Sequence, residues 1–343
     1  MTSKKVLMLH TGGTLGMSGQ RPEPLRPDTY THRMLEHVPE LSRLAALDVE
    51  ILFNLDSSNV TPRHWDDIGR RIHQRHDDYD GFVVVHGTDT MAYTASACAF
   101  LLEGLRKPVV FTGSQRPLGQ VRSDARSNLV GAVEMATQDI PEVTVFFDSK
   151  LLRGVRTVKS DVWGYAAFDS PNFPPLAEAG VDLLIRPDRV RRPAGPRRLA
   201  AGFSAPVACL EVTPGFAPAL VEAAVDAGAR GLVLRAFGSG NVPDQDGAVP
   251  PAIGRVVQRG VPVVLVTQAW RGGADLHLYE CGQRALDAGA VDGGDLTTPA
   301  AVVKLAWLLT AGRDVEGVRA AFAQDLRGEG GMAARRPMKG ATG

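Results

Sequence analysis

Short runs of apolar residues alternate with segments of helical periodicity along the first part of this chain. The apolar runs fall at residues 6–9, 49–53, 81–85, 109–112 and 143–147. They are continuous rather than alternating, which is typical of strands buried on both faces of a parallel sheet. Helical periodicity lies between them, at residues 30–37, 62–76, 91–105 and 124–137. This βαβ series predicts an open, doubly wound sheet with right-handed crossovers.

A second, shorter alternation begins at Pro206. It predicts strands at residues 207–211, 231–235 and 261–266, and helices at residues 217–227, 252–258, 299–310 and 315–326. The preceding segment, residues 186–205, is rich in proline and arginine, which is the composition of a linker. Its arginines could form a phosphate-binding patch, but no aromatic residues interleave them, so we interpret them as a solvated face.

The domain organisation follows from these two alternations. We expect an α/β fold with a doubly wound, mostly parallel sheet in a large N-terminal domain at residues 1–185. The linker at residues 186–205 leads to a smaller α/β C-terminal domain at residues 206–328. Residues 329–343 are rich in Gly, Arg and Ala without periodicity, which predicts a flexible tail.

Composition and charge exclude several classes of protein. The 343 residues include 38 Lys+Arg and 38 Asp+Glu, so the formal net charge is zero, which disfavours a nucleic-acid partner. No apolar run approaches the ~18–20 residues that span a bilayer, and the run at the N-terminus is too short for a signal peptide. Neither the cysteines nor the histidines form a ligand cluster. We therefore expect a cytoplasmic protein without a membrane partner or a metal ion.

Three polar clusters each follow a predicted strand. In chain order they are Thr11-Gly12-Gly13-Thr14, Asp56-Ser57-Ser58-Asn59 and His86-Gly87-Thr88-Asp89-Thr90. Glycines let a backbone turn tightly and approach a ligand closely, although a tight turn or a helix cap would account for each cluster taken alone. The first cluster lacks the G-x-G-x-x-G order of a dinucleotide fingerprint and the Gly-Lys-Ser/Thr of a phosphate loop.

The position of these clusters favours a binding site. In an open parallel sheet, ligands bind at the carboxyl ends of the strands, where the winding reverses. If the three strands are neighbours, one crevice holds several hydroxyls, two carboxylates and two helix N-termini. Such a crevice suits a small zwitterion, with Asp89 facing an ammonium group and the loop of Ser57 and Ser58 facing a carboxylate.

The ordered set of motifs resembles the bacterial type I (cytoplasmic) L-asparaginase family. Residues 11–14 and 86–90 are similar to its two signature segments, and the similarity covers roughly residues 5 to 326. The further matching segments are Tyr79-Asp80-Gly81, Gly113-Ser114-Gln115-Arg116-Pro117, Arg122-Ser123-Asp124 to Asn128-Leu129, Asp169-Ser170-Pro171-Asn172, Gly238-Ser239-Gly240-Asn241 and Asp295-Leu296-Thr297-Thr298. The family fold has a large doubly wound N-terminal domain and a smaller α/β C-terminal domain, in agreement with the periodicity.

The resemblance implies catalytic roles at the matching positions. Thr14 is implied to be the nucleophile that attacks the side-chain amide of asparagine, and a threonine hydroxyl needs a partner to accept its proton. Thr88, Asp89 and Lys159 are similar to the family's Thr–Asp–Lys relay. Backbone N–H groups near Thr14 and Thr88 are expected to stabilise the developing oxyanion.

The resemblance also implies a substrate-binding set. Its members are Asp56, Ser57, Ser58, Thr88, Asp89 and Ser114. Within it, Asp89 is implied to bind the substrate ammonium, Ser57 and Ser58 the α-carboxylate, and the backbone of Ser114 the amide. Asp124 and Asn128 are spaced i,i+4 on a predicted helix, and we interpret them as a hydrogen-bonded brace.

One departure from the family's pattern concerns closure over the substrate. The family carries a tyrosine on a mobile loop after the T-G-G-T segment, whereas here the corresponding stretch reads Pro22-Glu23-Pro24-Leu25. The nearest tyrosine is Tyr30, at the start of a predicted helix. Tyr30 is therefore the candidate gate, and the alternative is activation of Thr14 by another route.

The activity implied by the resemblance is hydrolysis of L-asparagine to L-aspartate and ammonia through an acyl-enzyme, without a metal or organic cofactor. Two alternatives stay open: a catalytically weak asparagine-binding regulatory protein, and an amidase subunit of the amidotransferase type. The resemblance further implies a homodimer or homotetramer, and a second, regulatory asparagine site around residues 235–241 in some members of the family.

Overall fold

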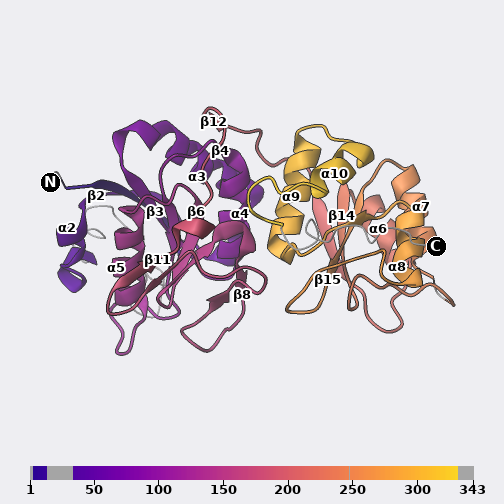
Figure 1. Ribbon diagram of the computed structural model, residues 1–343, viewed down its shortest axis with the longest axis horizontal. Helices are drawn as coiled ribbons and strands as arrows, with labels where there is room; N and C mark the ends of the chain where they lie inside the picture. Colours follow the sequence, from indigo (N-terminus) through magenta and orange to yellow (C-terminus); the bar gives the residue numbers. More distant parts are fainter. Residues whose placement is uncertain (1–2, 14–33, 247, 331–343) are drawn as a thin grey trace. The chain divides into compact units, whose positions relative to one another are not determined.

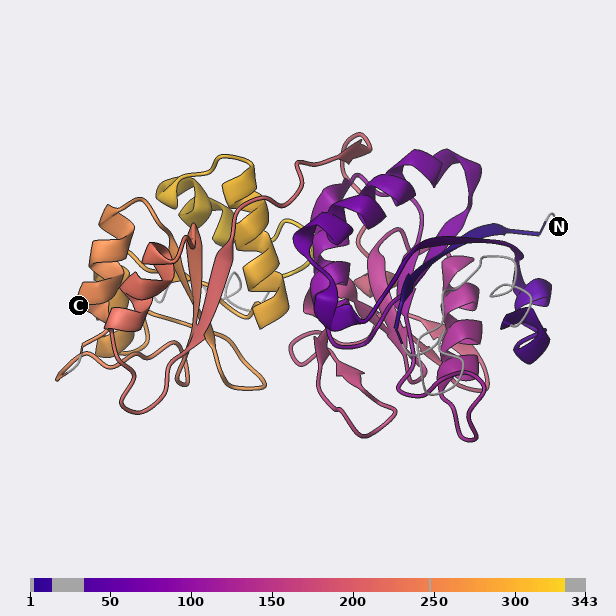
Figure 2. The same cartoon turned by 180° about the vertical axis from the view of Figure 1, so that it is seen from behind.

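The computed structural model describes residues 3–13, 34–246 and 248–330. These residues form two compact units that divide between Gly202 and Phe203 (Figures 1 and 2). Each unit contains a sheet with helices packed on both faces. The α/β class expected from the sequence is confirmed.

The N-terminal unit is built on an eight-stranded sheet with the order β11-β10-β7-β6-β5-β3-β1-β2. Its parallel strands are β1 (Lys5–Gly12), β2 (Ala46–Leu55), β3 (Gly81–Val85), β5 (Val109–Thr112) and β6 (Val143–Phe147). These are the strands predicted from the apolar runs, so the doubly wound, mostly parallel sheet is confirmed. The winding reverses at β1, because β2 lies on one side of it and β3 on the other.

Antiparallel strands complete this sheet beyond β6. They are β7 (Lys150–Arg153), β10 (Ala177–Ala179) and β11 (Leu183–Ile185). None of them is predicted from the sequence. Strands of three or four residues are too short to show a periodicity that distinguishes them from a loop.

Helices cover both faces of the N-terminal sheet. α3 (Pro62–Arg75) and α4 (Met91–Leu101) pack on one face, and α2 (Leu41–Leu44) and α5 (Ala125–Ala136) pack on the other. Successive residues of β1 therefore enter different apolar clusters, Leu7 with α3 and α4 and Met8 with α5. This double burial is the reason why the strand is continuously apolar.

Local chemistry sets the helix boundaries. α3 begins where Thr61 and His64 form a reciprocal capping box, with Pro62 at the first turn. α4 ends at Leu101, earlier than predicted, because Leu102–Glu103 forms β4 and pairs with β12 (Arg198–Leu199). A strand from the expected linker thus holds the segment that follows this helix.

Much of the expected linker at residues 186–205 belongs to the N-terminal unit, which extends to Gly202. Arg192 pairs with Asp139 at 2.8 Å, and Arg197 pairs with Asp77 at 2.8 Å. The expected solvated face is therefore partly an ion-paired one. Exposed pairs of this kind contribute little individually, so they set the path of the chain more than its stability.

The C-terminal unit contains a parallel sheet with the order β13-β14-β15-β16. Its strands are β13 (Val207–Glu211), β14 (Gly231–Ala236), β15 (Val263–Thr267) and β16 (Val291–Asp292). α6 (Ala219–Asp226), α7 (Pro250–Gln258) and α8 (Glu280–Asp287) cover one face, and α9 (Thr298–Thr310) and α10 (Val315–Phe322) cover the other. The predicted smaller α/β domain is present, although α8 and β16 are not predicted from the sequence.

The expected flexible tail begins with a residue that is buried. Glu329 is fully buried, and its carboxylate lies 2.6 Å from the ammonium of Lys304 on α9. The same ammonium donates to the carbonyl oxygen of Gln324 at 2.8 Å. A buried ion pair between distant residues leaves no trace in local periodicity, which is why the sequence gives no sign of it.

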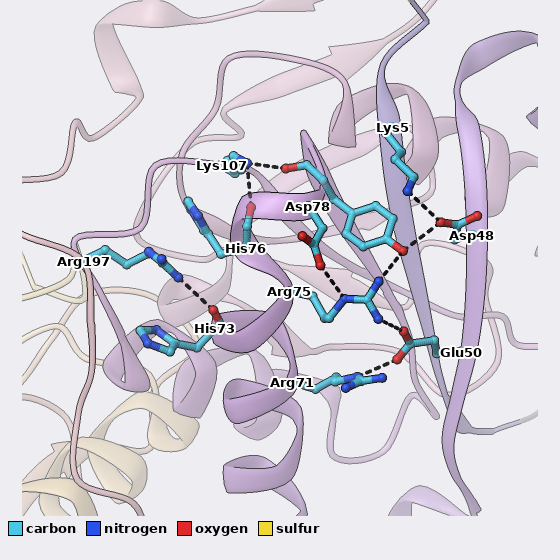
Figure 3. Close-up of polar contacts among 11 residues, drawn as sticks. Lys5, Asp48, Glu50, Arg71, His73, Arg75, His76, Asp78, Lys107 and Arg197 are labelled. Carbon is cyan, nitrogen blue, oxygen red and sulfur yellow. Dashed lines mark hydrogen bonds and ion pairs between the residues drawn. The ribbon is translucent and has the colours of Figure 1, made fainter.

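A network of charged side chains joins the end of α3 to β2, at the amino ends of β1 and β3 (Figure 3). Arg75 donates to Glu50 at 2.6 Å, to Asp78 at 2.8 Å and to the hydroxyl of Tyr79 at 2.9 Å. Tyr79 in turn donates to Asp48 at 2.8 Å. Burial and this bond raise the pKa of Tyr79 to about 12.

Candidate active site

The candidate site lies at the carboxyl ends of β1 and β3, where the winding of the N-terminal sheet reverses. The polar clusters that follow β1, β2 and β3 meet there, as predicted from their position after neighbouring strands. This arrangement places backbone turns from three loops against one another.

Two glycines bring the first and third loops into direct contact. Gly12 and Gly13 have φ angles of +116° and +89°, which are strained for any residue with a Cβ. A Cβ on Gly13 would stand 2.6 Å from the Cα and the nitrogen of Gly87. The N–H of Gly13 donates to the carbonyl oxygen of Leu55 at 3.1 Å. The glycines are therefore required by close backbone packing.

Lys159 meets Thr88 and Asp89 in the same site. Its ammonium donates to Thr88 Oγ1 at 2.8 Å and to Asp89 Oδ1 at 2.6 Å. The Lys159 side chain is 17% exposed and that of Asp89 is 61% exposed, so the carboxylate keeps an open side toward solvent. The structure thus brings together the three residues of the expected relay, because strand β8 (Val158–Lys159) carries the lysine to the loop that follows β3.

The loop of Asp56, Ser57 and Ser58 is tied to the Asp89 loop. Asp56 accepts hydrogen bonds from the backbone nitrogen and the hydroxyl of Ser58, at 2.9 and 2.7 Å, and these bonds lower its pKa. Ser57 is buried, and its hydroxyl oxygen accepts from the N–H of Asp89 at 3.2 Å. A hydroxyl that accepts one hydrogen bond can also donate one, so Ser57 is able to bind an anionic group.

His86 is a buried part of the site to which the sequence reasoning assigned no role. Its Nδ1 lies 2.7 Å from the carbonyl oxygen of Gly87, and because a carbonyl only accepts, Nδ1 carries the proton. Its Nε2 lies 3.0 Å from Thr94 Oγ1. Burial lowers the pKa of His86 to about 4, so the ring is neutral at pH 7. A histidine directly after a fully apolar strand is the signal that could have identified it.

A brace at the start of α5 shapes the loop that carries Ser114. Asp124 accepts from the backbone nitrogen of Gln115 at 2.9 Å and from Asn128 Nδ2 at 3.1 Å. Asn128 also donates to the carbonyl oxygen of Gly113 at 3.0 Å. The predicted brace is confirmed. Ser114 is buried, and its hydroxyl donates within the loop, which leaves its backbone as the group that could contact a ligand.

Thr14 and Tyr30 lie outside the described residues, so the nucleophile and the gate stay predictions. Across residues 3–13, 34–246 and 248–330, no group of three or more His, Cys, Asp or Glu side chains is arranged to hold a metal ion. Within the same ranges, no helix has the length and apolar character needed to cross a membrane.

The fold and the site define a two-domain α/β protein with a small polar site at a topological switch point. Residues 5–191 match the family described as "Asparaginase, N-terminal", and residues 206–322 match the "Glutaminase/Asparaginase C-terminal domain". The chain belongs to the asparaginase family. The resemblance drawn from the motifs is confirmed.

Similarity to individual proteins supports the assignment of this chain to the asparaginase family. The chain is 39% identical to L-asparaginase 1 of Escherichia coli (strain K12), over 96% of this chain and 98% of that protein. It matches the solved structure of the thermostable L-asparaginase from Thermococcus kodakarensis with a TM-score of 0.88 and 35% identity, over 96% and 99% of the two chains. It is also 36% identical to a glutamyl-tRNA(Gln) amidotransferase subunit of Aeropyrum pernix, over 95% of this chain and 79% of that protein.

Proposed function

We propose that this chain is an amidohydrolase that converts L-asparagine to L-aspartate and ammonia. The observation that carries the proposal is the ammonium of Lys159, which is hydrogen-bonded to both Thr88 and Asp89. A lysine held in this way can keep a hydroxyl poised for proton transfer, as a guanidinium cannot. The names of the relatives with high coverage support asparagine as the substrate.

Substrate binding in this proposal uses opposite charges at two ends of a small zwitterion. The exposed carboxylate of Asp89 accepts the α-ammonium group, and the hydroxyl of Ser57 donates to the α-carboxylate. Ser58 and Asp56 hold the turn that presents Ser57. The backbone near Ser114 contacts the side-chain amide. A substrate that lacks one of the two charged groups would lose the corresponding anchor.

The reaction proceeds in two steps in this proposal. The hydroxyl oxygen of Thr14 attacks the amide carbon, the C–N bond breaks, and the amide nitrogen leaves as ammonia with the transferred proton. Water then adds to the acyl carbon, the ester bond to Thr14 breaks, and the proton returns to the threonine oxygen. Thr88, Asp89 and Lys159 accept and return protons in these steps.

The relative from Aeropyrum pernix supports a second candidate, an amidase subunit that works within an amidotransferase. Such a subunit would deliver ammonia to a partner rather than act alone. A third candidate, an asparagine-binding protein of weak activity, follows from the missing loop tyrosine. We further propose, on the resemblance alone, that the chain is cytoplasmic and forms a homodimer or homotetramer. Analytical ultracentrifugation would test the oligomeric state.

A steady-state assay with the purified chain separates these candidates. We expect ammonia release from L-asparagine by the chain alone, and slower release from L-glutamine at equal concentration. Calorimetric binding of asparagine without ammonia release would instead establish the binding protein. Release that requires a partner subunit would establish the amidotransferase role.

A further inference from the structure

Lys159 lies on a hairpin whose two ends are held in different ways. The hairpin pairs β8 (Val158–Lys159) with β9 (Phe168–Asp169). At its base, Phe168 is buried, and its ring lies 5.0 Å from that of Phe147. At its tip, Val162 is 85% exposed and Trp163 is 92% exposed. Apolar packing therefore holds the base, whereas the tip depends on polar contacts.

The tip has an internal turn that makes it a defined structure. The carboxylate of Asp161 accepts from the backbone nitrogens of Trp163 at 2.7 Å and of Gly164 at 3.0 Å. These two bonds lower the pKa of Asp161. They orient the carbonyl oxygen of Gly164 and the side chain of Tyr165, the groups through which the tip contacts another loop.

Two side chains connect this tip to the loop at residues 113–124. Gln115 Nε2 donates to the carbonyl oxygen of Gly164 at 3.0 Å. The hydroxyl of Tyr165 donates to the carbonyl oxygen of Arg122, a residue with a φ angle of +60°. Because the buried carboxylate of Asp124 holds the backbone of Gln115, the contacts lead from the tip to the start of α5.

We propose that Gln115 and Tyr165 are positioning residues that lock the Lys159 hairpin to the loop at residues 113–124. A lysine side chain has a flexible four-carbon stem, so movement of the hairpin backbone would add conformers in which the ammonium leaves Thr88 and Asp89. We call the two hydrogen bonds donated by Gln115 and Tyr165 the tether. The tether fixes the backbone of Lys159 beside Thr88 and Asp89, and it makes the positions of Lys159 and Ser114 interdependent. The catalytic consequence rests on the proposed function; the tether itself does not.

The tether is tested first by hydrogen exchange. The variants are Gln115→Met, which removes the donor at similar volume, Tyr165→Phe, and the double substitution. The amide of Ser160, which donates to Ala167 at 2.8 Å, reports on the hairpin. We expect exchange in residues 158–168 to rise about fivefold in each single variant, the effect of one lost hydrogen bond. Exchange equal to that of the wild type in the double variant would overturn the tether.

Kinetics then test the positioning role. We expect kcat for asparagine to fall about fivefold in each single variant and further in the double variant, with KM nearly unchanged. Tyr79→Phe is the matched control, because it removes a hydroxyl bonded to Asp48 at the amino end of the sheet. It should lower thermal stability and leave both kcat and hairpin exchange unchanged.

The outcomes are distinguishable. Faster exchange with unchanged kcat would overturn the positioning role and leave the tether in place. A loss of kcat that merely follows melting temperature, and appears in Tyr79→Phe as well, would also overturn it. If the wild type does not hydrolyse asparagine, the proposed function fails and the positioning role with it, whereas the exchange data still decide the tether.

Discussion

At the scale of single residues, Lys159 illustrates what the sequence can and cannot predict. It lies 71 positions from Thr88, to which it is hydrogen-bonded. Its neighbours Val158 and Ser160 form no motif, so only the family resemblance predicts its role. Thr88 and Asp89 were predictable from the residues alone, because they follow a buried strand at the carboxyl edge of a parallel sheet. Gln115 and Tyr165 were not, because their contacts join loops that are distant in sequence.

Replacing Lys159 should abolish turnover without unfolding the chain. Lys159→Met removes the ammonium that bonds Thr88 and Asp89, and we expect kcat to fall at least about 100-fold. Lys159→Arg keeps the charge but cannot exchange a proton at neutral pH, so a similar loss is expected. Steady-state ammonia release measures both, and circular dichroism verifies the fold. Activity retained in Lys159→Arg would mean that only the charge matters.

The close packing of Gly87 against Ser57 gives a second prediction at this scale. A Cβ on Gly87 would stand 2.7 Å from Ser57 Oγ, so Gly87→Ala must displace Ser57. We expect a higher KM for asparagine and a loss of about 1–3 kcal/mol in stability. Gly119→Ala is the control, because nothing lies within 4 Å of a Cβ there. An unchanged KM in Gly87→Ala would argue against Ser57 as a substrate ligand.

At the scale of elements, the length of a helix or strand decides whether the sequence predicts it. The buried parallel strands and helices such as α3 and α5 carry enough periodicity and capping chemistry to appear in the sequence. The end of α4 does not, since it depends on pairing between β4 and a strand about a hundred residues later. The short antiparallel strands are also invisible, because they depend on tertiary pairing.

The end of α3 offers a test of an element's stability. Lys107 donates to the carbonyl oxygens of His76 and Tyr79, just beyond the helix, the first at 2.6 Å (Figure 3). Lys107→Met leaves both acceptors without this donor, and we expect a loss of about 1–3 kcal/mol in urea unfolding. The exposed Lys150 supplies the control, Lys150→Met, with little change expected. Equal stability of the two variants would contradict this role of Lys107.

At the scale of the whole molecule, buried histidines predict how stability depends on pH. Burial lowers the pKa of His86 and of His10 from 6.5 to about 4, and a hydrogen bond to Asn54 opposes the shift for His10. The unfolded chain binds more protons between these two values, so stability is complete above about pH 6.5 and falls as the pH drops toward 4. The loss is on the order of 3 kcal/mol for each histidine.

Chemical denaturation between pH 7.5 and 4.5 tests this dependence. His86→Gln should reduce the slope in the window between pH 6.5 and 4, even if it lowers the stability at pH 7. His277→Gln, on the exposed surface of the C-terminal unit, is the control for the substitution itself, because it removes no buried ring. A slope in His86→Gln that equals that of the wild type would show that other groups cause the acid sensitivity.

Thr14 is the proposed nucleophile of an asparagine-hydrolysing enzyme, and the proposed roles of Thr88, Asp89 and Lys159 depend on it. The most direct measurement is ammonia release from L-asparagine by the wild type and by Thr14→Ala, together with calorimetric binding of asparagine to both. We predict turnover by the wild type and a loss of at least about 1000-fold in Thr14→Ala, with binding retained. Unimpaired turnover by Thr14→Ala would contradict this role.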